Sequence, residues 1–315
     1  MLQYLIIILD ECSTSFCHYD IPKNKGSRLI DIDQLKMGIK FAMMENLSIQ
    51  FVYPKEDLPS DYLDVINTVE HIDIKPHVDG RGGDSDVVVF NEMPLNLFED
   101  NYLTLVFRLT FQEFFSFQHY LAKEVFQRVK RLNIVIRKID TFQTWDLDSY
   151  NKKLKEISEW IEDEMSKGNN PQWNILTDRM MLSKMNNCGA GDTTITIGPN
   201  GKFYICPAFY YENMDDSVGD LHNGLNIPNQ QLLKLEYAPI CRYCDAYQCK
   251  RCVWLNRNKT LEVNTPSHEQ CVSAHLERNA SRMILQNLRR KGNENMEYVD
   301  IKEIDYLDPF NNRLL

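Results

Sequence analysis

The chain has 315 residues, of which 43% are hydrophobic and 25% charged, and its formal net charge is −10. This apolar content excludes a chain that is disordered along most of its length. The acidic balance excludes nucleic-acid binding through attraction to the phosphate backbone, which requires a basic surface. The longest apolar run, residues 4–9, falls far short of the roughly 20 residues that span a bilayer, and no basic segment precedes it. We therefore expect a soluble, cytoplasmic protein that binds neither nucleic acid nor a membrane.

The first half of the sequence predicts strands that alternate with helices. Residues 4–9 form a continuous apolar run, typical of a strand buried on both faces. In residues 31–46, apolar side chains recur every four positions, as on one face of a helix. Further strands are expected at residues 48–53, 86–90, 103–109 and 133–136, and further helices at residues 61–70, 112–129 and 148–167. This alternation indicates an α/β fold of parallel βαβ units, in an open sheet or a partial barrel.

Two segments of this half raise the question of a binding site. Gly80, Gly82 and Gly83 form a glycine cluster, but no clear helix follows it, so a surface loop is favoured over a phosphate-binding loop. The aromatic residues of segment 111–120 are candidates for a peptide groove. Aromatic residues at helical spacing belong more often to the core.

The second half begins with a predicted hairpin. Two short strand-like runs, residues 193–197 and 202–205, flank the sequence Gly198-Pro199-Asn200-Gly201. An Asn-Gly pair supplies the positive φ values that a tight turn requires.

A loop is expected from Cys252 to Ser267. There Ser267 and Gln270 form a capping-box pattern that begins a helix ending near Arg290. Cys271 is expected in the first turn of this helix, where the helix dipole favours a thiolate.

Seven of the nine cysteines lie in the second half: Cys188, Cys206, Cys241, Cys244, Cys249, Cys252 and Cys271. In a reducing compartment such a dense set indicates a metal site rather than disulfides. Two Cys-x2-Cys pairs are separated by only four residues, whereas zinc ribbons usually place a dozen or more between their pairs. Seven thiolates exceed one four-ligand site and fall one short of two. Iron–sulfur clusters tolerate an incomplete protein shell.

The spacing thus favours iron–sulfur clusters, with zinc or simply buried thiols as alternatives. A two-zinc arrangement would need one histidine in addition, and the candidates are His222, His268 and His275.

The order of these residues resembles the SPASM domain, the C-terminal extension of radical SAM enzymes that modify ribosomal peptides and proteins. The shared pattern is Cys188, twelve residues, Gly201, four residues and Cys206, followed by the cysteine quartet and Cys271. The quartet of this chain, with two, four and two intervening residues, is more tightly spaced than is usual in the family. The whole chain is more specifically similar to the CXXX repeat peptide maturases, which are found beside small cysteine-repeat peptides.

This resemblance implies a fold and a domain division. Residues 1–175 would form a partial (β/α) barrel of radical SAM type. Residues 176–290 would form a small cysteine-rich α+β SPASM domain with a β-hairpin and a C-terminal helix, and residues 291–315 a polar tail.

The resemblance also implies two auxiliary 4Fe–4S clusters. The ligands of the first would be Cys188, Cys206 and Cys252. The ligands of the second would be Cys241, Cys244, Cys249 and Cys271. One iron of the first cluster then lacks a protein thiolate, and a cysteine of the substrate peptide is a hypothetical ligand for it.

The N-terminal region departs from the radical SAM pattern. Those enzymes carry Cys-x3-Cys-x2-Cys after the first strand, whereas this chain has only Cys12 and Cys17, with His18 as a conceivable third ligand. The family binds the amino group of SAM with Gly-Gly-Glu-Pro; here Glu92 and Pro94 resemble that motif, but its glycines are absent. Both departures argue against reductive SAM cleavage.

Three functions follow as hypotheses. The first is an iron–sulfur maturase component that binds a cysteine-repeat precursor peptide, relays electrons, and works beside a radical SAM partner enzyme. The second is an active radical SAM peptide-modifying enzyme with an unusual N-terminal site. The third is a zinc-stabilised interaction scaffold. The sequence identifies no catalytic residue.

Overall fold

The computed structural model describes residues 1–22, 26–78, 85–92, 101–116, 119–249 and 251–292, with only the backbone given for residues 119–123. These residues belong to two compact units. Unit 1 consists of Met1–Asn91 and Cys188–Lys234, and unit 2 of Glu92–Asn187 and Leu235–Leu315. The glycine cluster at residues 80–83, Pro94 and the expected tail from residue 293 lie outside the described residues.

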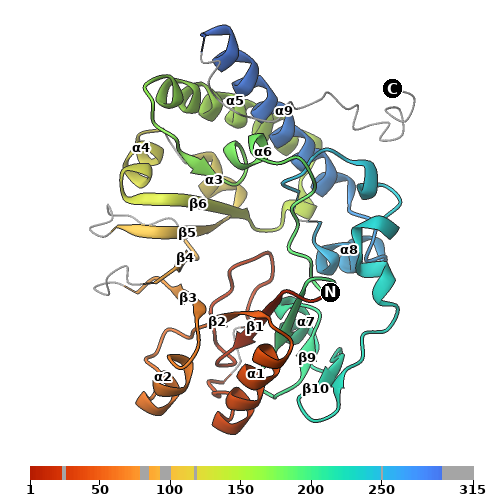
Figure 1. Ribbon diagram of the computed structural model, residues 1–315. Helices are drawn as coiled ribbons and strands as arrows, with labels where there is room; N and C mark the ends of the chain where they lie inside the picture. The colour runs from red at the N-terminus through yellow and green to blue at the C-terminus, as the bar shows by residue number, and fades with distance from the viewer. Residues whose placement is uncertain (23–25, 79–84, 93–100, 117–118, 250, 293–315) are drawn as a thin grey trace. The chain divides into compact units, whose positions relative to one another are not determined.

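Unit 1 alternates strands with helices along most of its length (Figure 1). Its strands are β1 (Tyr4–Ile8), β2 (Ser48–Val52), β3 (His71–Pro76), β4 (Val87–Phe90), β8 (Thr194–Ile197), β9 (Phe203–Tyr204), β10 (Gly219–Asp220) and β11 (Gly224–Leu225). Its helices are α1 (Ile32–Met44), α2 (Ser60–Ile66) and α7 (Pro207–Glu212), with the short 3-10 helix η2 (Gln230–Leu233).

The main sheet of unit 1 has the order β4-β3-β2-β1-β8-β9. All its neighbouring strands are parallel except β9, which runs antiparallel to β8. Ile7 of β1 is paired with Phe51 on one side and with Ile197 on the other. The central position of β1 explains why its sequence is apolar throughout, because a strand covered on both faces has no side that meets water.

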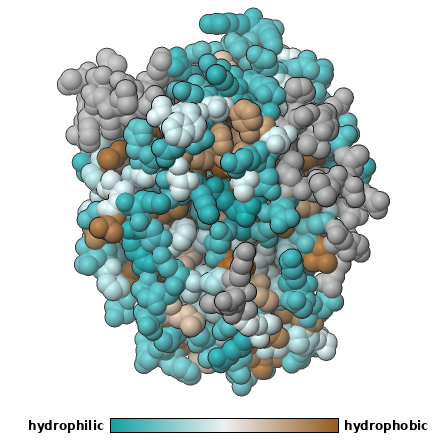
Figure 2. Space-filling view, turned by 180° about the vertical axis from the view of Figure 1, so that it is seen from behind, coloured by the Kyte–Doolittle hydropathy of each residue, from teal (hydrophilic) through white to brown (hydrophobic). Residues whose placement is uncertain are grey.

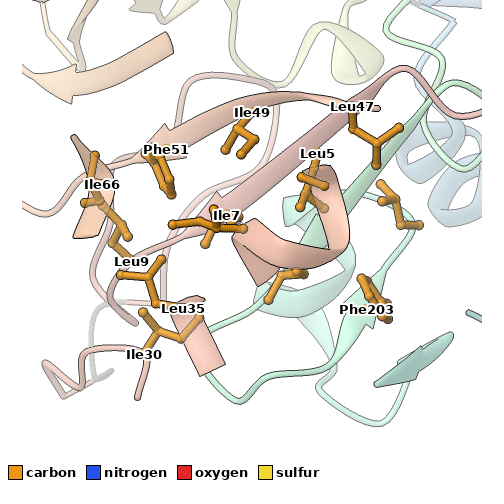
Figure 3. Packing of buried hydrophobic residues seen from close by; sticks show 14 of the residues in the cluster. Leu5, Ile7, Leu9, Ile30, Leu35, Leu47, Ile49, Phe51, Ile66 and Phe203 are labelled. Atoms are coloured by element: carbon orange, nitrogen blue, oxygen red, sulfur yellow. The ribbon is translucent and has the colours of Figure 1, made fainter. Parts of the chain in front are cut away.

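One apolar core lies between this sheet and α1 (Figure 3). Leu5, Ile7 and Phe51 from the sheet and Leu35 from α1 are all fully buried in it. The helix begins where the side chain of Asp31 accepts hydrogen bonds from the backbone N–H groups of residues 33 and 34, which satisfies donors that a helix start leaves open. The predicted helix is confirmed, and of its expected apolar stripe Leu35 and Ile39 are buried, whereas Met43 is 67% exposed.

The predicted hairpin is present as β8 and β9. Its turn ends at Gly201, whose φ of +72° is a conformation that L residues rarely adopt. A Cβ at this position would also lie 2.6 Å from Nε2 of Gln34 on α1. Because β8 pairs with β1, the hairpin extends the N-terminal sheet rather than standing apart from it. The domain boundaries at residues 175 and 290 stay a prediction.

Unit 2 combines a small parallel sheet of order β7-β6-β5 with a helical layer. Its strands are β5 (Tyr102–Leu109), β6 (Val129–Ile136) and β7 (Gln172–Trp173). Its helices are α3 (Phe111–Ser116), α4 (His119–Arg128), α5 (Thr144–Ser166), α6 (Thr177–Met180), α8 (Val253–Thr260) and α9 (His268–Arg290), with the 3-10 helices η1 (Ile139–Thr141), η3 (Leu235–Tyr237) and η4 (Cys241–Tyr243).

The two 23-residue helices of unit 2, α5 and α9, pack side by side (Figure 1). The hydroxyl of Tyr150 donates to Glu277 Oε1 at 2.6 Å, and Asn287 Nδ2 donates to Glu162 Oε1 at 2.8 Å. Ser267 caps α9 by accepting from the backbone N–H of Gln270, which confirms the predicted start of the helix; Gln270 Oε1 does not complete the expected capping box.

The structure corrects the sequence-based expectations in three places. Strand β3 was not predicted, although its apolar residues alternate with His71, Asp73 and Lys75 as in a half-buried strand. The helix expected over residues 112–129 is described as α3 and α4, on either side of residues 117–118, and its last expected residue, Val129, already belongs to β6, which pairs along β5.

The segment after Cys252, expected to be a loop, begins with helix α8. This helix has no side-chain cap at its start and ends at Leu261 with a φ of 62°, where glycine or asparagine is the usual residue. The helix therefore carries no start or stop signal in its sequence.

Figure 2 shows a face on which hydrophilic residues predominate and apolar residues form separate spots. Among the described helices, none is both long enough and apolar enough to cross a membrane.

Candidate metal centre

Four cysteines of unit 2 line one small cavity: Cys241, Cys244, Cys249 and Cys271. The remaining lining is apolar apart from one imidazole, that of His275. These four are the cysteines that the resemblance assigns to the second cluster. Their assignment as ligands stays a prediction, but all four residues line the same cavity.

Short-range structure brings three of these thiols together. Cys241 begins η4, and the backbone N–H of Cys244 closes that turn by donating to the carbonyl of Cys241 at 3.1 Å. The backbone N–H of Ala246 then donates to Cys244 Sγ at 3.4 Å. A second turn follows, in which the N–H of Cys249 donates to the carbonyl of Ala246 at 2.8 Å. The fourth thiol, Cys271, comes from the first turn of α9.

Burial dominates the acidity of these thiols. It raises the pKa of Cys241 to about 11 and that of Cys271 to about 12, and it also raises the pKa values of Cys244 and Cys249. At Cys271, burial therefore opposes the thiolate that is expected from its place in the first turn of α9. Any metal that binds here must displace protons from the thiols.

His275 is the histidine that lies at this cavity. Its Nε2 is 3.2 Å from Cys244 Sγ, and the residue is only 1% exposed. Burial, together with the charge of Arg278, lowers the pKa of His275 to about 4, so the ring is neutral at physiological pH. The other two histidines considered for zinc lie elsewhere: His268 is exposed at the start of α9, and His222 is exposed in the turn between β10 and β11.

A buried ionic network stands beside Cys244. Arg278 Nη1 donates to Asp245 Oδ1 at 2.9 Å, and Arg179 Nη2 lies 3.8 Å from Asp245 Oδ2. The guanidinium of Arg179 also covers the ring of Tyr247 at 4.3 Å. Two cations thus face one carboxylate. Although burial raises the pKa of Cys244, both arginines act in the opposite direction and favour its thiolate.

A third buried arginine contacts the set. The side chain of Arg251, 3% exposed, is hydrogen-bonded to the Cys241 thiol and donates to Asn264 Oδ1 at 2.9 Å. Sequence reasoning missed Asp245, Arg251 and Arg278. One signal was present for the last: Cys271, His275 and Arg278 are spaced four and three residues apart, which places them on one face of a helix.

The cysteines assigned to the first cluster are distributed differently. Cys188 and Cys206 belong to unit 1, where Cys188 is exposed and its carbonyl accepts from Thr194 Oγ1 at 2.8 Å. Burial and then the charge of Cys188 raise the pKa of Cys206. Cys252 belongs to unit 2, where it is 9% exposed at the start of α8 and does not line the four-cysteine cavity.

The loop after β1 holds Cys12 and Cys17 in separate surroundings. Burial, with a contribution from Asp10, raises the pKa of Cys12 to about 12, and its Sγ lies 3.9 Å from Glu56 Oε2. Cys17 lies close enough to Cys206 to influence its acidity. This loop is fastened to α7, because the hydroxyl of Tyr211 donates to the carbonyl of Ser13 at 3.2 Å.

Two other candidates from the sequence, Glu92 and the described residues of the aromatic segment 111–120, do not line the four-cysteine cavity. Glu92, the described part of the region resembling the SAM-binding motif, is exposed. In the aromatic segment, Phe114 is fully buried and packs against Tyr150 with ring centroids 5.3 Å apart, so it belongs to the core. The side chains of residues 117–120 lie outside the described part.

A larger cavity of about 1030 Å³ lies in unit 2, lined in part by Phe126 and Trp160. It includes the first residues of β5, β6 and β7. Parallel α/β sheets place their chemistry at the carboxyl ends of the strands, which is the opposite edge. This cavity is therefore not a candidate for the reaction site.

The donor set of unit 2 fits a group that takes four separate thiolates. Among the described residues, no three His, Cys, Asp or Glu side chains converge closely enough to hold a single ion. In a 4Fe–4S cluster each iron takes one thiolate, so the four sulfurs need not meet at one atom. The four cysteines around an apolar cavity, with N–H donors at three of the sulfurs, are consistent with that chemistry.

No family model and no curated protein matches the sequence. Solved structures do match. A structure of hexahistidine-tagged anSMEcpe with bound AdoMet is 13% identical and has a TM-score of 0.60, over 92% of this chain and 100% of that chain. Native anSMEcpe with bound AdoMet and the Cp18Cys peptide is 13% identical with a TM-score of 0.60, over 94% of this chain and 100% of that chain. These similarities confirm the fold class: α/β, with a largely parallel sheet of the partial radical SAM barrel type.

Proposed function

We propose that the chain is an iron–sulfur component of a ribosomal-peptide modification system. In this role it binds a cysteine-rich precursor peptide and relays electrons, and a radical SAM partner enzyme cleaves SAM. The observation that carries the proposal is the set of four cysteines around one apolar cavity in unit 2. The similarity to anSMEcpe structures, one of which holds a peptide, supports a peptide as the partner.

The residues of unit 2 have defined tasks under this proposal. Cys241, Cys244, Cys249 and Cys271 would hold a 4Fe–4S cluster, which supplies one-electron transfer when bound. The apolar lining excludes water from the sulfurs, and the buried arginines compensate the negative charge of four thiolates. Cys188, Cys206 and Cys252 would hold the first cluster.

The active-enzyme alternative is favoured by one observation, since anSMEcpe of the same fold is crystallised with AdoMet. Against it, the loop after β1 offers two cysteines, where the radical SAM pattern has three. A zinc scaffold is less well supported, because no three candidate ligands among the described residues converge on one ion.

The test is to purify the protein without oxygen and to measure iron, acid-labile sulfide and zinc per chain. About eight irons with equal sulfide would support two auxiliary clusters, and about four would restrict the proposal to the unit 2 site. About twelve, together with 5′-deoxyadenosine formation from SAM, would make the active enzyme the better interpretation. Zinc without sulfide would contradict the proposal and leave the scaffold.

A further inference from the structure

One face of α9 meets the cysteine-rich loop of unit 2. Cys271 and His275 lie one turn apart on that face, and Arg278 follows one turn later. Two contacts hold the loop there: His275 Nε2 lies 3.2 Å from Cys244 Sγ, and Arg278 is paired with Asp245 at 2.9 Å. The ion pair of Arg278 with Asp245 thus holds the cysteine loop next to His275, whose ring lies against Cys244 Sγ.

The contact between His275 and Cys244 has one favourable polarity once the cysteine binds metal. A metal-bound sulfur carries no proton and can only accept a hydrogen bond. A neutral imidazole donates from one ring nitrogen and accepts at the other. The sulfur thus selects the tautomer with the proton on Nε2. Since the backbone N–H of Ala246 also donates to Cys244 Sγ at 3.4 Å, this sulfur would receive two donors.

Donors to a cluster sulfur affect the two oxidation states unequally. The reduced cluster carries one more negative charge than the oxidised cluster, and the positive end of an N–H dipole stabilises that charge. Hydrogen bonds to the sulfurs are one of the means by which proteins set cluster potentials. In a buried site of low dielectric this effect is stronger than in water.

We propose that His275 is a positioning residue that donates its Nε2–H to Cys244 Sγ and thereby raises the reduction potential of the cluster in unit 2. This inference rests on the proposed function, because it requires a cluster at the four cysteines. A cluster held by these cysteines would take one electron from an external reductant, and no bond would be formed or broken.

The test compares three variants of the full-length protein. His275→Leu removes the donor and keeps an apolar wall, and His275→Gln replaces the imidazole N–H with an amide N–H at a similar position. His268→Leu, which changes an exposed histidine seven residues earlier on the same helix, is the matched control. Iron and sulfide are measured first, and the midpoint potential is then determined by EPR during titration with dithionite, which supplies the electron. A signal that persists in Cys188→Ser is assigned to the unit 2 site.

We expect His275→Leu to retain its iron and to be reduced about tenfold less favourably, a shift of about 59 mV to more negative potential for a one-electron couple. His275→Gln should recover most of this shift, and His268→Leu should match the wild type. If the leucine variant does not fold, His275→Phe, which fills the volume of the ring without a donor, takes its place.

Full iron with an unchanged potential in His275→Leu or His275→Phe would overturn this inference and leave the proposed function intact. Loss of iron in both variants would also overturn it, because His275 would then be needed to bind the cluster rather than to set its potential. Wild-type protein without iron would overturn the proposed function and this inference together.

Discussion

The two units treat their cysteines in different ways. In unit 2, four thiols face one cavity, and three of them come from a stretch of nine residues that two short turns fold onto itself. In unit 1, Cys188 is exposed, Cys206 starts α7, and Cys12 and Cys17 occupy a loop after β1. Thiols that are close in sequence can converge through local turns, whereas thiols on distant elements depend on the packing of the sheet around them.

The largest expected effect comes from removing two of the converging thiols. Cys241→Ala combined with Cys244→Ala should lose about four irons per chain and expose residues 235–292 to limited proteolysis, because metal-binding energy at such a site is folding energy. Cys188→Ala combined with Cys206→Ala is the matched pair in unit 1 and should retain the irons of unit 2. Iron analysis and proteolysis followed by mass spectrometry provide the measurement. If the variant with Cys241→Ala and Cys244→Ala stayed folded and resistant to protease, the converging thiols of unit 2 would not be needed for its fold.

The second effect concerns the ion pair that holds the cysteine loop against α9. Arg278→Met leaves Asp245 buried with only the more distant Arg179 at 3.8 Å, and it should lower the free energy of unfolding by about 3–5 kcal/mol. The measurement is urea denaturation followed by circular dichroism. Arg290→Met, at an exposed position in the last turn of the same helix, should change stability by less than about 0.5 kcal/mol. Equal effects of the two substitutions would show that the pair does not stabilise the loop.

The smallest effect tests the hairpin that leads to Cys206 in unit 1. Gly201→Ala imposes a side chain on a residue with a φ of +72° and should cost about 1–2 kcal/mol in addition to the crowding at Gln34. Thermal unfolding is the measurement. Gly26→Ala is the control, since no atom lies within 4 Å of the position that its Cβ would take. Stability that is equal in the two variants would mean that the turn relaxes.

Where local signals were strong, the sequence predicted the fold well. The continuous apolar run of β1, the apolar spacing of α1, the turn glycine Gly201 and the Ser267 cap of α9 each act within a few residues. Helix α8 lacks such a signal, because it begins without a side-chain cap, whereas β3 carries the alternation of polar and apolar residues that is typical of a strand and was overlooked.

The site was predictable only in part. Cysteine density singled out seven thiols, and the resemblance to the SPASM domain grouped the four of them that line the cavity. His275 was considered only as a zinc ligand. The contacts of Asp245, Arg251 and Arg278 with the cysteine loop depend on how that loop approaches α9, which no local pattern records.

The length of α9 has a consequence for the whole of unit 2. Its first turns carry Cys271 and His275, and its later turns bind α5 through Glu277 and Asn287. One continuous helix of 23 residues thus connects the cavity with the helical layer. If the thiols bind no metal and the first turns of α9 are less well held, we expect the contacts of α9 with α5 to be weaker as well. The metal content of the site and the stability of the α5 interface would then depend on the same helix.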